Sequence, residues 1–147
     1  MLKFRPFRLS DYSELRQMMH ELSREGPSTE RVTDRKISLT VRELQNNPKR
    51  GRIIVFEKDS SIIGYAVLIF YWSNEYGGNI LHIDELYVKP EHRGRGVATS
   101  FFKKILGMNH SVGAFELEVT PANTRAMNYY HKLGFKKSQN VHLVRTI

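Results

Sequence analysis

The sequence predicts an α/β fold of the α+β kind, in which a mixed, largely antiparallel sheet is flanked by helices. Two β-rich runs around a polar turn, within 52–72, indicate an antiparallel hairpin. Segments with apolar residues at helical spacing occur before and after that hairpin. The length of 147 residues suits one domain, 1–147. The expected element order is β-α-α-β-β-β-α-β-α-β, a single layered architecture.

The N-terminal third is expected to contain a strand and two helices. The segment 3–11 reads as a short strand that runs into a turn, and Ser10 or Asp11 can cap the helix that follows. The apolar face of that helix contains Leu15, Met18, Met19 and Leu22. A second helix, ended by turn residues at 46–51, is expected to use Ile37, Leu39, Val41 and Leu44.

The middle of the chain is expected to form the hairpin, a third strand and a helix. Within the hairpin, Gly64 indicates a β-bulge or the close approach of another backbone. A third β-rich run at 80–88 ends before Pro90. Residues 94–106 then follow helical spacing, with an apolar face of Val97, Phe101, Ile105 and Leu106.

The C-terminal part is expected to add two strands and one helix. The segment 114–119 reads as a strand. A helix over 123–133 has its stop signal at Gly134, where helices commonly end on a glycine. The segment 140–147 is predicted to close the sheet as a final strand.

The composition excludes several classes of protein. Hydrophobic residues at 40% and charged residues at 26% are ordinary for a soluble globular protein. The longest apolar runs, such as 66–70, are too short to cross a bilayer, and basic and apolar residues alternate at the N-terminus, so we expect a cytoplasmic protein without a membrane span. The chain has no cysteine, which rules out disulfides, thiolate metal sites and a cysteine nucleophile. The histidines show no metal-ligand spacing with carboxylates, so we expect no metal.

A glycine-rich, basic segment, HRGRGVAT at 92–99, comes directly before an amphipathic helix. The first N–H groups of a helix have no partners inside the helix, and the helix dipole is positive there, so this position suits an anion. Gly94 and Gly96 allow close approach because they lack a Cβ. The pattern fits neither the dinucleotide-binding fingerprint nor the P-loop. The alternative is a turn that only starts a packed helix.

Two motifs resemble those of the GNAT family of N-acetyltransferases. Arg93-x-x-Gly96-x-Ala98 resembles the family's R/Q-x-x-G-x-G/A signature, whose loop holds the pyrophosphate of acetyl-coenzyme A. The segment 123–135, NTRAMNYYHKLGF, resembles the family's second motif, in which a tyrosine precedes x-x-x-Gly-Phe. The element order resembles the family's fold over nearly the whole chain.

The resemblance implies where acetyl-CoA, the expected cosubstrate, would bind. The backbone of Leu86, Tyr87 and Val88 would lie along the pantetheine arm, as if the ligand were an added strand. Asn123 would hydrogen-bond the pantetheine side. Arg93 and Arg95 would screen phosphate charge or remain solvated. The N–H groups that would hold the pyrophosphate belong to Gly94, Arg95, Gly96, Val97, Ala98 and Thr99.

The resemblance also implies the catalytic groups. Tyr130 would protonate the leaving thiolate, unless its hydroxyl is satisfied elsewhere. A main-chain N–H near Leu86 would polarise the thioester carbonyl. The base that removes a proton from the amine would be Glu85 or Asp84, and after them Glu118; each could instead neutralise nearby arginines. Strand alternation sends Asp84 and Glu85 to opposite faces unless a bulge intervenes.

The acceptor side is less defined. His82 is a further candidate because its ordinary pKa is near neutral, although a lone histidine in a strand is more often packed than catalytic. The loop around 71–78 would border the acceptor cleft, and Trp72, Glu75 and Tyr76 would suit a cation or form an exposed turn. The resemblance also makes a homodimer an expected assembly.

We therefore expect an N-acetyltransferase in which a primary amine of a small molecule or peptide attacks acetyl-CoA directly in a ternary complex. Two alternatives remain open at this stage. The net charge of +8 and the isoelectric point near 9.8 are compatible with a nucleic-acid-binding module, but no recognition motif is present, so we do not expect a nucleic-acid partner. A catalytically silent acyl-CoA sensor is the other alternative.

Overall fold

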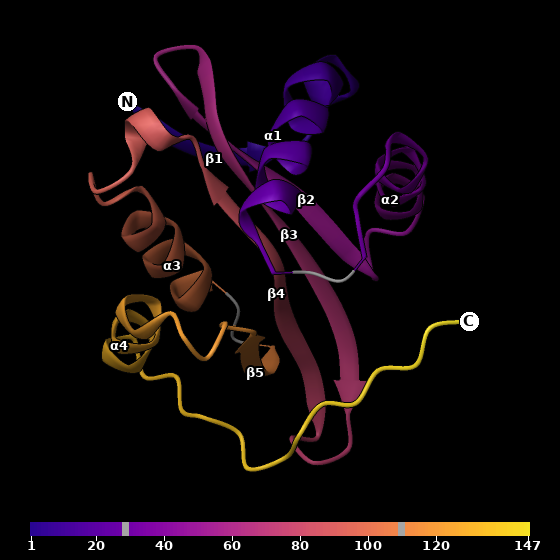
Figure 1. The fold of residues 1–147 in the computed structure, drawn as a ribbon, viewed down its shortest axis with the longest axis vertical. Helices are drawn as coiled ribbons and strands as arrows, with labels where there is room; N and C mark the ends of the chain where they lie inside the picture. Colours follow the sequence, from indigo (N-terminus) through magenta and orange to yellow (C-terminus); the bar gives the residue numbers. More distant parts are fainter. Residues whose placement is uncertain (28–29, 109–110) are drawn as a thin grey trace. The chain divides into compact units, whose positions relative to one another are not determined.

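The computed structural model describes residues 1–27, 30–108 and 111–147 (Figure 1). The chain divides into two compact units, Met1–Leu117 and Glu118–Ile147, and each is described by itself. The first unit contains the sheet and helices α1, α2 and α3, and the second contains helix α4. None of the helices in the described residues combines the length and the apolar character that a bilayer crossing requires.

The sheet of the first unit has five strands in the order β1-β2-β3-β4-β5. Neighbouring strands from β1 to β4 are antiparallel, and β5 is parallel to β4. The predicted mixed, largely antiparallel sheet is confirmed. The strand bounds are β1 Leu2–Pro6, β2 Gly51–Lys58, β3 Ser61–Ser73, β4 Gly78–Val88 and β5 Val112–Leu117.

The predicted β2–β3 hairpin turns at Asp59 and Ser60, whose φ angles of 49° and 64° fit a tight two-residue turn. Both expectations for Gly64 are confirmed. The strand register shifts beside it, and a Cβ on Gly64 would lie 2.4 Å from the carbonyl oxygen of Tyr87 and 2.9 Å from the ring of Phe56. A side chain at this position would therefore push β3 away from its neighbours.

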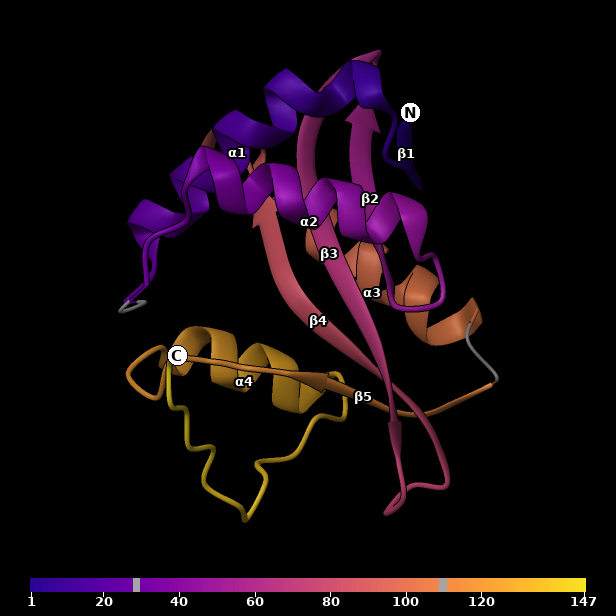
Figure 2. The same ribbon diagram turned by 90° about the vertical axis from the view of Figure 1, so that its right-hand side faces the viewer.

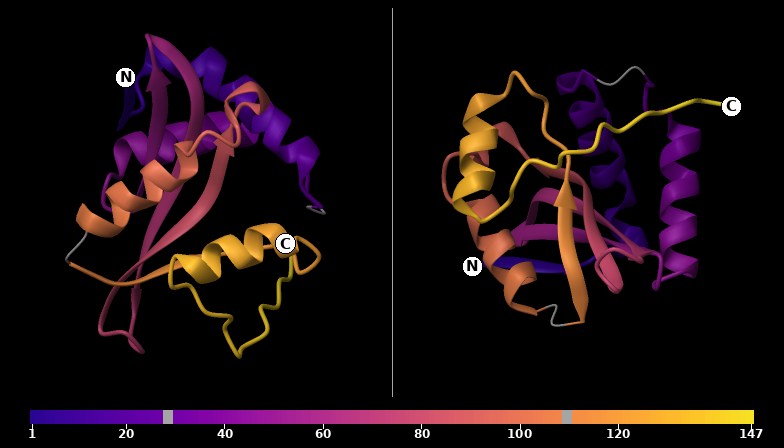
Figure 3. Two further views of the ribbon diagram at one scale, coloured as in Figure 1. Left: turned by 90° about the vertical axis from the view of Figure 1, so that its left-hand side faces the viewer. Right: turned by 90° about the horizontal axis from the view of Figure 1, so that it is seen from below.

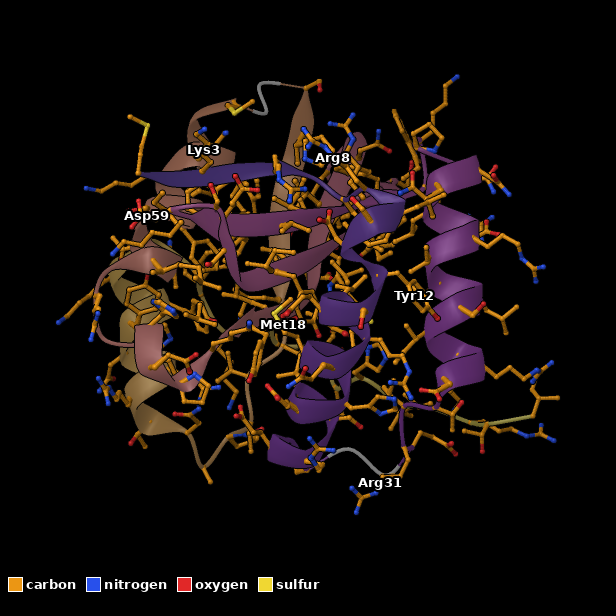
Figure 4. All side chains as sticks on the ribbon, turned by 90° about the horizontal axis from the view of Figure 1, so that it is seen from above. Lys3, Arg8, Tyr12, Met18, Arg31 and Asp59 are labelled. Atoms are coloured by element: carbon orange, nitrogen blue, oxygen red, sulfur yellow. The ribbon has the colours of Figure 1, made fainter. Side chains whose placement is uncertain are left out.

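Helices α1 (Tyr12–Glu25) and α2 (Asp34–Asn46) cover one face of the sheet (Figure 2). Figure 4 shows Met18 between α1 and the strands. Leu39, predicted on the apolar face of α2, is instead 39% exposed, because the buried stripe follows positions 37, 41 and 44. The helix side chains buried here are Leu15, Met18, Met19, Ile37, Val41 and Leu44.

The predicted cap at the start of α1 is wrong in its details. Asp11 occupies the N-cap position, but its side chain makes no cap to α1. It accepts a hydrogen bond of 2.8 Å from the backbone N–H of Arg8 and two, of 2.8 and 3.0 Å, from the guanidinium of Arg5. Because a buried carboxylate needs a charged partner, the basic residue on β1 takes precedence over the helix end.

Helix α3 (Val97–Met108) lies on the opposite face of the sheet (Figure 3). The core there is aromatic: the ring of Phe56 lies 4.9 Å from Phe101 and 5.0 Å from Phe4, measured between ring centroids. The prediction for this helix omitted Phe102, which is fully buried, whereas Leu106 is half-buried. Rings on both elements therefore fix α3 against the sheet.

The second unit contains α4 (Thr124–Lys132), which begins after Asn123 and ends near Gly134, where φ is 95°. The final strand predicted over 140–147 is wrong, since no strand is formed there. A β-rich sequence becomes a strand only when its N–H and C=O groups pair with a neighbour. Within the described residues this segment has no such partner, and it leaves exposed Val141, Leu143, Val144 and Ile147.

Candidate active site

A β-bulge in β4 determines which way the two adjacent carboxylates face. Val67 of β3 is opposite Glu85, and Leu68 is opposite Ile83, so Asp84 is the extra residue. Val67 belongs to the core beneath α1 and α2, which places Glu85 on the face that those helices cover. From the sequence alone, it was open whether a bulge intervenes at Asp84 and Glu85; the structure contains one.

Glu85 is half-buried, and its hydrogen-bond partner on β3 is Tyr65. The phenol of Tyr65 donates to Glu85 Oε1 at 3.0 Å, and Tyr65 itself has no exposed surface. The pKa of Glu85 is raised to about 7: burial is the main cause, the Tyr65 hydrogen bond opposes the rise, and the negative charge of Asp84 adds to it. A carboxyl group with this pKa can accept a proton near neutral pH.

Asp84 belongs to a cluster that bridges β4 and β5. His82 Nε2 lies 3.5 Å from Asp84 Oδ1, and His82 Nδ1 lies 2.8 Å from Glu116 Oε1. The Nδ1 atom is buried without an aligned hydrogen bond, so its contact with Glu116 is an ion-pair contact. Asp84 and then Glu116 raise the pKa of His82 against the effect of burial. The phenol of Tyr71 donates to the other oxygen of Glu116 at 2.7 Å.

Helix α1 is joined to the end of β4 by hydrogen bonds and ion pairs. The phenol of Tyr87 donates to Glu21, and burial raises the pKa of that phenol to about 12. Lys89 pairs with Glu14 at 2.9 Å. An open cleft of about 500 Å³ lies here, lined by Gln17, Glu21, Arg24, Glu25, Tyr87, Lys89, Pro90 and Glu91.

The β4–β5 pair separates at the bulge. The last paired residues are Ile83 and Leu117, and β4 continues through 84–88 with β3 as its partner on the other side (Figure 2). Among the described residues, 86–88 therefore pair with no strand other than β3, although the carbonyl of Val88 accepts a hydrogen bond from the Arg93 side chain. Such an edge can accept an extended ligand by strand addition.

The loop after β4 presents unshielded backbone. Gly94 and Gly96 have φ angles of 71° and 77°, and a Cβ at either position would meet no atom within 4 Å. Within the described part of the chain, no backbone hydrogen bond is donated by Gly94, Arg95, Gly96, Val97 or Ala98. Thr99 follows in the first turn of α3. These N–H groups fit a diphosphate at a helix N-terminus.

The two arginines of the loop differ in their surroundings. Arg93 donates from Nε to the carbonyl of Val88 at 2.7 Å and from its terminal nitrogen to Glu25 at 2.8 Å. Its guanidinium also lies 5.3 Å from the ring centroid of Tyr87. Arg93 thereby fixes the loop to β4 and α1. Arg95 is exposed, and its guanidinium makes no ion pair among the described residues.

The second unit carries the other predicted residues. Asn123 accepts a hydrogen bond of 3.1 Å from the N–H of Ala126 and so caps α4. Burial raises the pKa of Tyr130, and its ring lies 5.9 Å from that of Phe135. Glu118 was expected within a strand, but β5 ends at Leu117, so this placement is wrong.

Sequence reasoning missed three polar side chains of the sheet: Tyr65, Tyr71 and Glu116. Glu116 is the strand glutamate that contacts β4. The signal that could have revealed Tyr65 is the single polar group in the aliphatic run 62–69. A hydroxyl in a buried strand requires a hydrogen-bond partner. The predicted acceptor residues Trp72 and Tyr76 are 69% and 53% exposed, at the β3–β4 turn, and Glu75 lies beside them.

Among residues 1–27, 30–108 and 111–147, no group of three or more histidine and acidic side chains could hold a metal ion. The chemistry available at the bulge is proton transfer by carboxylates, together with attraction of cations. The edge of β4 at 86–88 and the glycine loop carry backbone groups of the kind that suit an extended, anionic ligand.

Comparison with known proteins identifies a family with this chemistry. The acetyltransferase (GNAT) family matches residues 15–135. Thialysine N-epsilon-acetyltransferase of Mus musculus is 26% identical over 141 residues, which cover 90% of this chain and 82% of the relative. An uncharacterized N-acetyltransferase of Mycobacterium bovis is 32% identical over 96 residues, which cover 64% of this chain and 58% of the relative.

Solved structures share the fold. A possible acetyltransferase from Clostridium difficile 630 superposes with a TM-score of 0.84 at 20% identity, covering 100% of this chain and 99% of that one. Aminoglycoside N-acetyltransferase AAC(6')-Iy in complex with CoA gives 0.78 at 18% identity, covering 99% and 95%. Neither alternative function, the nucleic-acid-binding module or the silent sensor, gains support from these findings. The chain belongs to the acetyltransferase (GNAT) family and is an N-acetyltransferase, an enzyme that transfers an acetyl group to an amine.

Proposed function

We propose that the enzyme transfers the acetyl group of acetyl-CoA to the primary amine of a cationic aminoalkyl acceptor, with Glu85 as the base. The observation that carries this proposal is the bulge at Asp84, which turns Glu85 into the buried face beneath α1 and α2. Burial raises the pKa of Glu85 to about 7, so about half of the carboxyl groups are ionised at neutral pH and able to accept a proton.

The reaction needs no covalent enzyme intermediate. Glu85 takes one proton from the acceptor ammonium, directly or through a water molecule. The neutral amine attacks the thioester carbonyl, a C–N bond forms, and the C–S bond breaks. A main-chain N–H near Leu86 stabilises the developing oxyanion. The leaving thiolate takes a proton from Tyr130, the tyrosine of the family motif, whose pKa is raised by burial so that its hydroxyl stays protonated. The second proton, lost from the attacking nitrogen as the amide forms, returns through solvent to the Tyr130 phenolate.

The residues present fit acetyl-CoA. The open space at Gly94 and Gly96 and the N–H groups of the loop suit the pyrophosphate. The edge of β4 at 86–88 suits the pantetheine arm, and Asn123 would bind the same arm. We assign phosphate screening to Arg95, because the Arg93 side chain already holds the loop to Val88 and Glu25.

The acceptor class follows from the carboxylates around the bulge. Asp84 adjoins Glu85 in the bulge, and Glu116 is linked to Asp84 through His82; the side chains of Asp84 and Glu116 are 53% and 43% exposed. Negative charge at this place attracts an ammonium and a second cationic group on the same molecule. The mouse relative is named for acetylation of a side-chain amine of thialysine, which is an acceptor of this kind. Trp72, Glu75 and Tyr76 lie at or beside the β3–β4 turn, roughly 20 Å along the strands from Glu85, so we do not assign them to the reacting end of the acceptor.

The direct test is an amine panel assayed for release of free CoA thiol, with polyamines, lysine analogues, aminoglycosides and peptide N-termini. We expect di- and polycationic aminoalkyl compounds to give the highest kcat/KM. Glu85→Gln should lower kcat at least about 100-fold at pH 7.5 while acetyl-CoA still raises the melting temperature. Full activity of Glu85→Gln would disprove the assignment of the base.

Two further parts of the proposal concern the cell and the assembly. We propose a cytoplasmic enzyme and a homodimer. Fractionation of producing cells tests the first, and light scattering of the purified protein tests the second.

A further inference from the structure

The aliphatic centre of β3 contains one phenol, and the proposed mechanism has not used it. Tyr65 has no exposed surface, so its hydroxyl cannot bind bulk water. Instead, the hydroxyl donates a hydrogen bond of 3.0 Å to Glu85 Oε1, next to the bulge. A buried hydroxyl satisfied in this way holds its acceptor in one geometry, since breaking the bond leaves a buried polar group unpaired.

We infer that Tyr65 is a positioning residue, which orients the Glu85 carboxylate toward the acceptor and keeps it available as the base. This inference rests on the proposed function of Glu85. The hydrogen bond occupies Oε1 and therefore leaves Oε2 for the acceptor. Tyr65 is paired with Tyr87 and Val67 with Glu85, so the Tyr65 side chain reaches Glu85 diagonally across the two strands.

The side chains that the other elements place around Glu85 are either apolar or already engaged in hydrogen bonds or ion pairs. The buried side chains of α2 at this face are Ile37, Val41 and Leu44, and those of α1 are Leu15, Met18 and Met19. The phenols of Tyr12 and Tyr87 also pack against this core, and Tyr87 is bonded to Glu21 of α1. On β4, Asp84, which lies beside His82, is the neighbouring charge that acts on Glu85. Glu116 of β5 contacts His82. Tyr65 is therefore the hydrogen-bond donor to Glu85 among the described residues.

The sign of the expected effect follows from this arrangement. A hydrogen bond to the ionised carboxylate favours the charged form, so it lowers the pKa of Glu85 against the larger effect of burial. Removing the hydroxyl should raise that pKa. The acidic limb of the kcat/KM profile, where Glu85 must lose its proton, should then move to higher pH.

The first experiment measures this profile for Tyr65→Phe between pH 5 and pH 9.5. We expect the acidic limb to move upward by about one pH unit, with kcat/KM at pH 6 about tenfold below that of the wild type and a much smaller difference at pH 9. The ionisation of the acceptor itself is common to all variants and cancels in the comparison. A purely structural role for Tyr65 would lower activity equally at every pH.

Tyr71→Phe is the matched control. It removes the same chemical group from the same strand, but its carboxylate partner is Glu116. Its acidic limb should stay within about 0.2 pH units of the wild type, well below the shift expected from loss of a hydrogen bond to the base itself. An equal shift in both variants would overturn the inference. If Glu85→Gln is inactive and the Tyr65→Phe profile is not shifted, the role of Tyr65 is rejected and that of Glu85 is retained. If Glu85→Gln is active, the proposed base itself is rejected.

A second measurement does not depend on the folding of Tyr65→Phe. In protein labelled with carbon-13 at the phenol carbon of tyrosine, one resonance should titrate with the midpoint of the acidic limb, as Glu85 gains its proton. That titration should be absent from Glu85→Gln. Glu21, the partner of Tyr87, has a lowered pKa and titrates at lower pH. If no tyrosine resonance follows the acidic limb, Tyr65 does not act through Glu85.

Discussion

His82 Nδ1 lies 2.8 Å from Glu116 Oε1, across the parallel β4–β5 pair and one position before the strands separate. On its other side, the same imidazole lies 3.5 Å from Asp84, the extra residue of the bulge. One ring thus faces two carboxylates at the place where β4 and β5 separate. The contact joins β5, the edge strand, to the proposed catalytic centre.

His82→Gln should destabilise the protein most at low pH. The pKa of His82 is raised above its ordinary 6.5 in the folded protein, so its stabilising effect is complete below pH 6.5 and is lost as pH rises through the raised value. We expect the free energy of unfolding to fall by about 1 kcal/mol at pH 5.5 and to change little at pH 9.5. The expected change is small because Asp84 and Glu116, the partners of His82, are partly exposed to solvent. Urea unfolding at both pH values measures it. His142→Gln, in the exposed C-terminal segment, serves as the control and should show no such difference.

Asp11→Asn should weaken the fold without acting on the catalytic groups. The Asp11 carboxylate is buried and bonded to Arg5, whose Nε also donates to Glu57 at 2.7 Å. The substitution therefore leaves the Arg5 guanidinium with one carboxylate partner, Glu57, instead of two. We expect a loss of about 3 kcal/mol in the free energy of unfolding at pH 7. The Arg5 hydrogen bond lowers the pKa of Asp11, so this stabilisation is present above pH 3.8 and is lost as pH falls through the lower folded value.

Asp59→Asn provides the comparison for Asp11. Asp59 pairs with the N-terminal amine in full solvent exposure, and asparagine tolerates its positive φ. Its unfolding curve should remain close to that of the wild type. Equal effects of the two substitutions would mean that the Arg5–Asp11 pair contributes no more than a surface pair.

Gly96→Ala should impair binding of acetyl-CoA more than folding. The added Cβ meets no protein atom, but alanine at a φ of 77° costs about 1 kcal/mol, and the methyl group stands where the pyrophosphate would lie. We expect the KM for acetyl-CoA to rise more than about tenfold, with the KM for the amine unchanged. Gly107→Ala is the matched control on the same helix: its Cβ is also unobstructed, and alanine favours a helix, so KM should stay constant.

Tyr130→Phe should lower kcat about 100-fold and leave both KM values within about threefold, as expected for loss of a proton donor that acts only in the transition state. Tyr129, its neighbour in the sequence, has a ring 5.4 Å away and is the control. Tyr129→Phe should retain most activity. The reverse result, an active Tyr130→Phe and an impaired Tyr129→Phe, would move the acid to the neighbouring position.

Several features could be predicted from the sequence because they depend on local interactions. The hairpin of β2 and β3 follows from two β-rich runs around Asp59 and Ser60, and the stripe of Leu15, Met18 and Met19 follows from helical periodicity. The glycines of the loop identified the helix that would meet a phosphate. The family motifs then indicated acetyl transfer, which the comparisons confirmed.

Errors arose where one segment depends on another. The strand predicted over 140–147 has the right residues but no neighbour to pair with in the described structure. Glu118 was taken for the strand glutamate, although β5 ends one residue earlier and Glu116 makes the contact to β4. Periodicity within a segment cannot reveal where a strand ends, because the end depends on its neighbour's register.

By itself, the sequence determined the order of the elements as far as α4, the glycine loop and the family, since each depends on residues close together along the chain. Only the tertiary structure decided which of two adjacent carboxylates faces the buried side of the sheet. That choice depends on one unpaired residue, Asp84, and on a phenol on the neighbouring strand, 20 residues away from Glu85 in the sequence. A bulge arises from the pairing of two strands, and the burial that raises the pKa of Glu85 arises from helices packed above them.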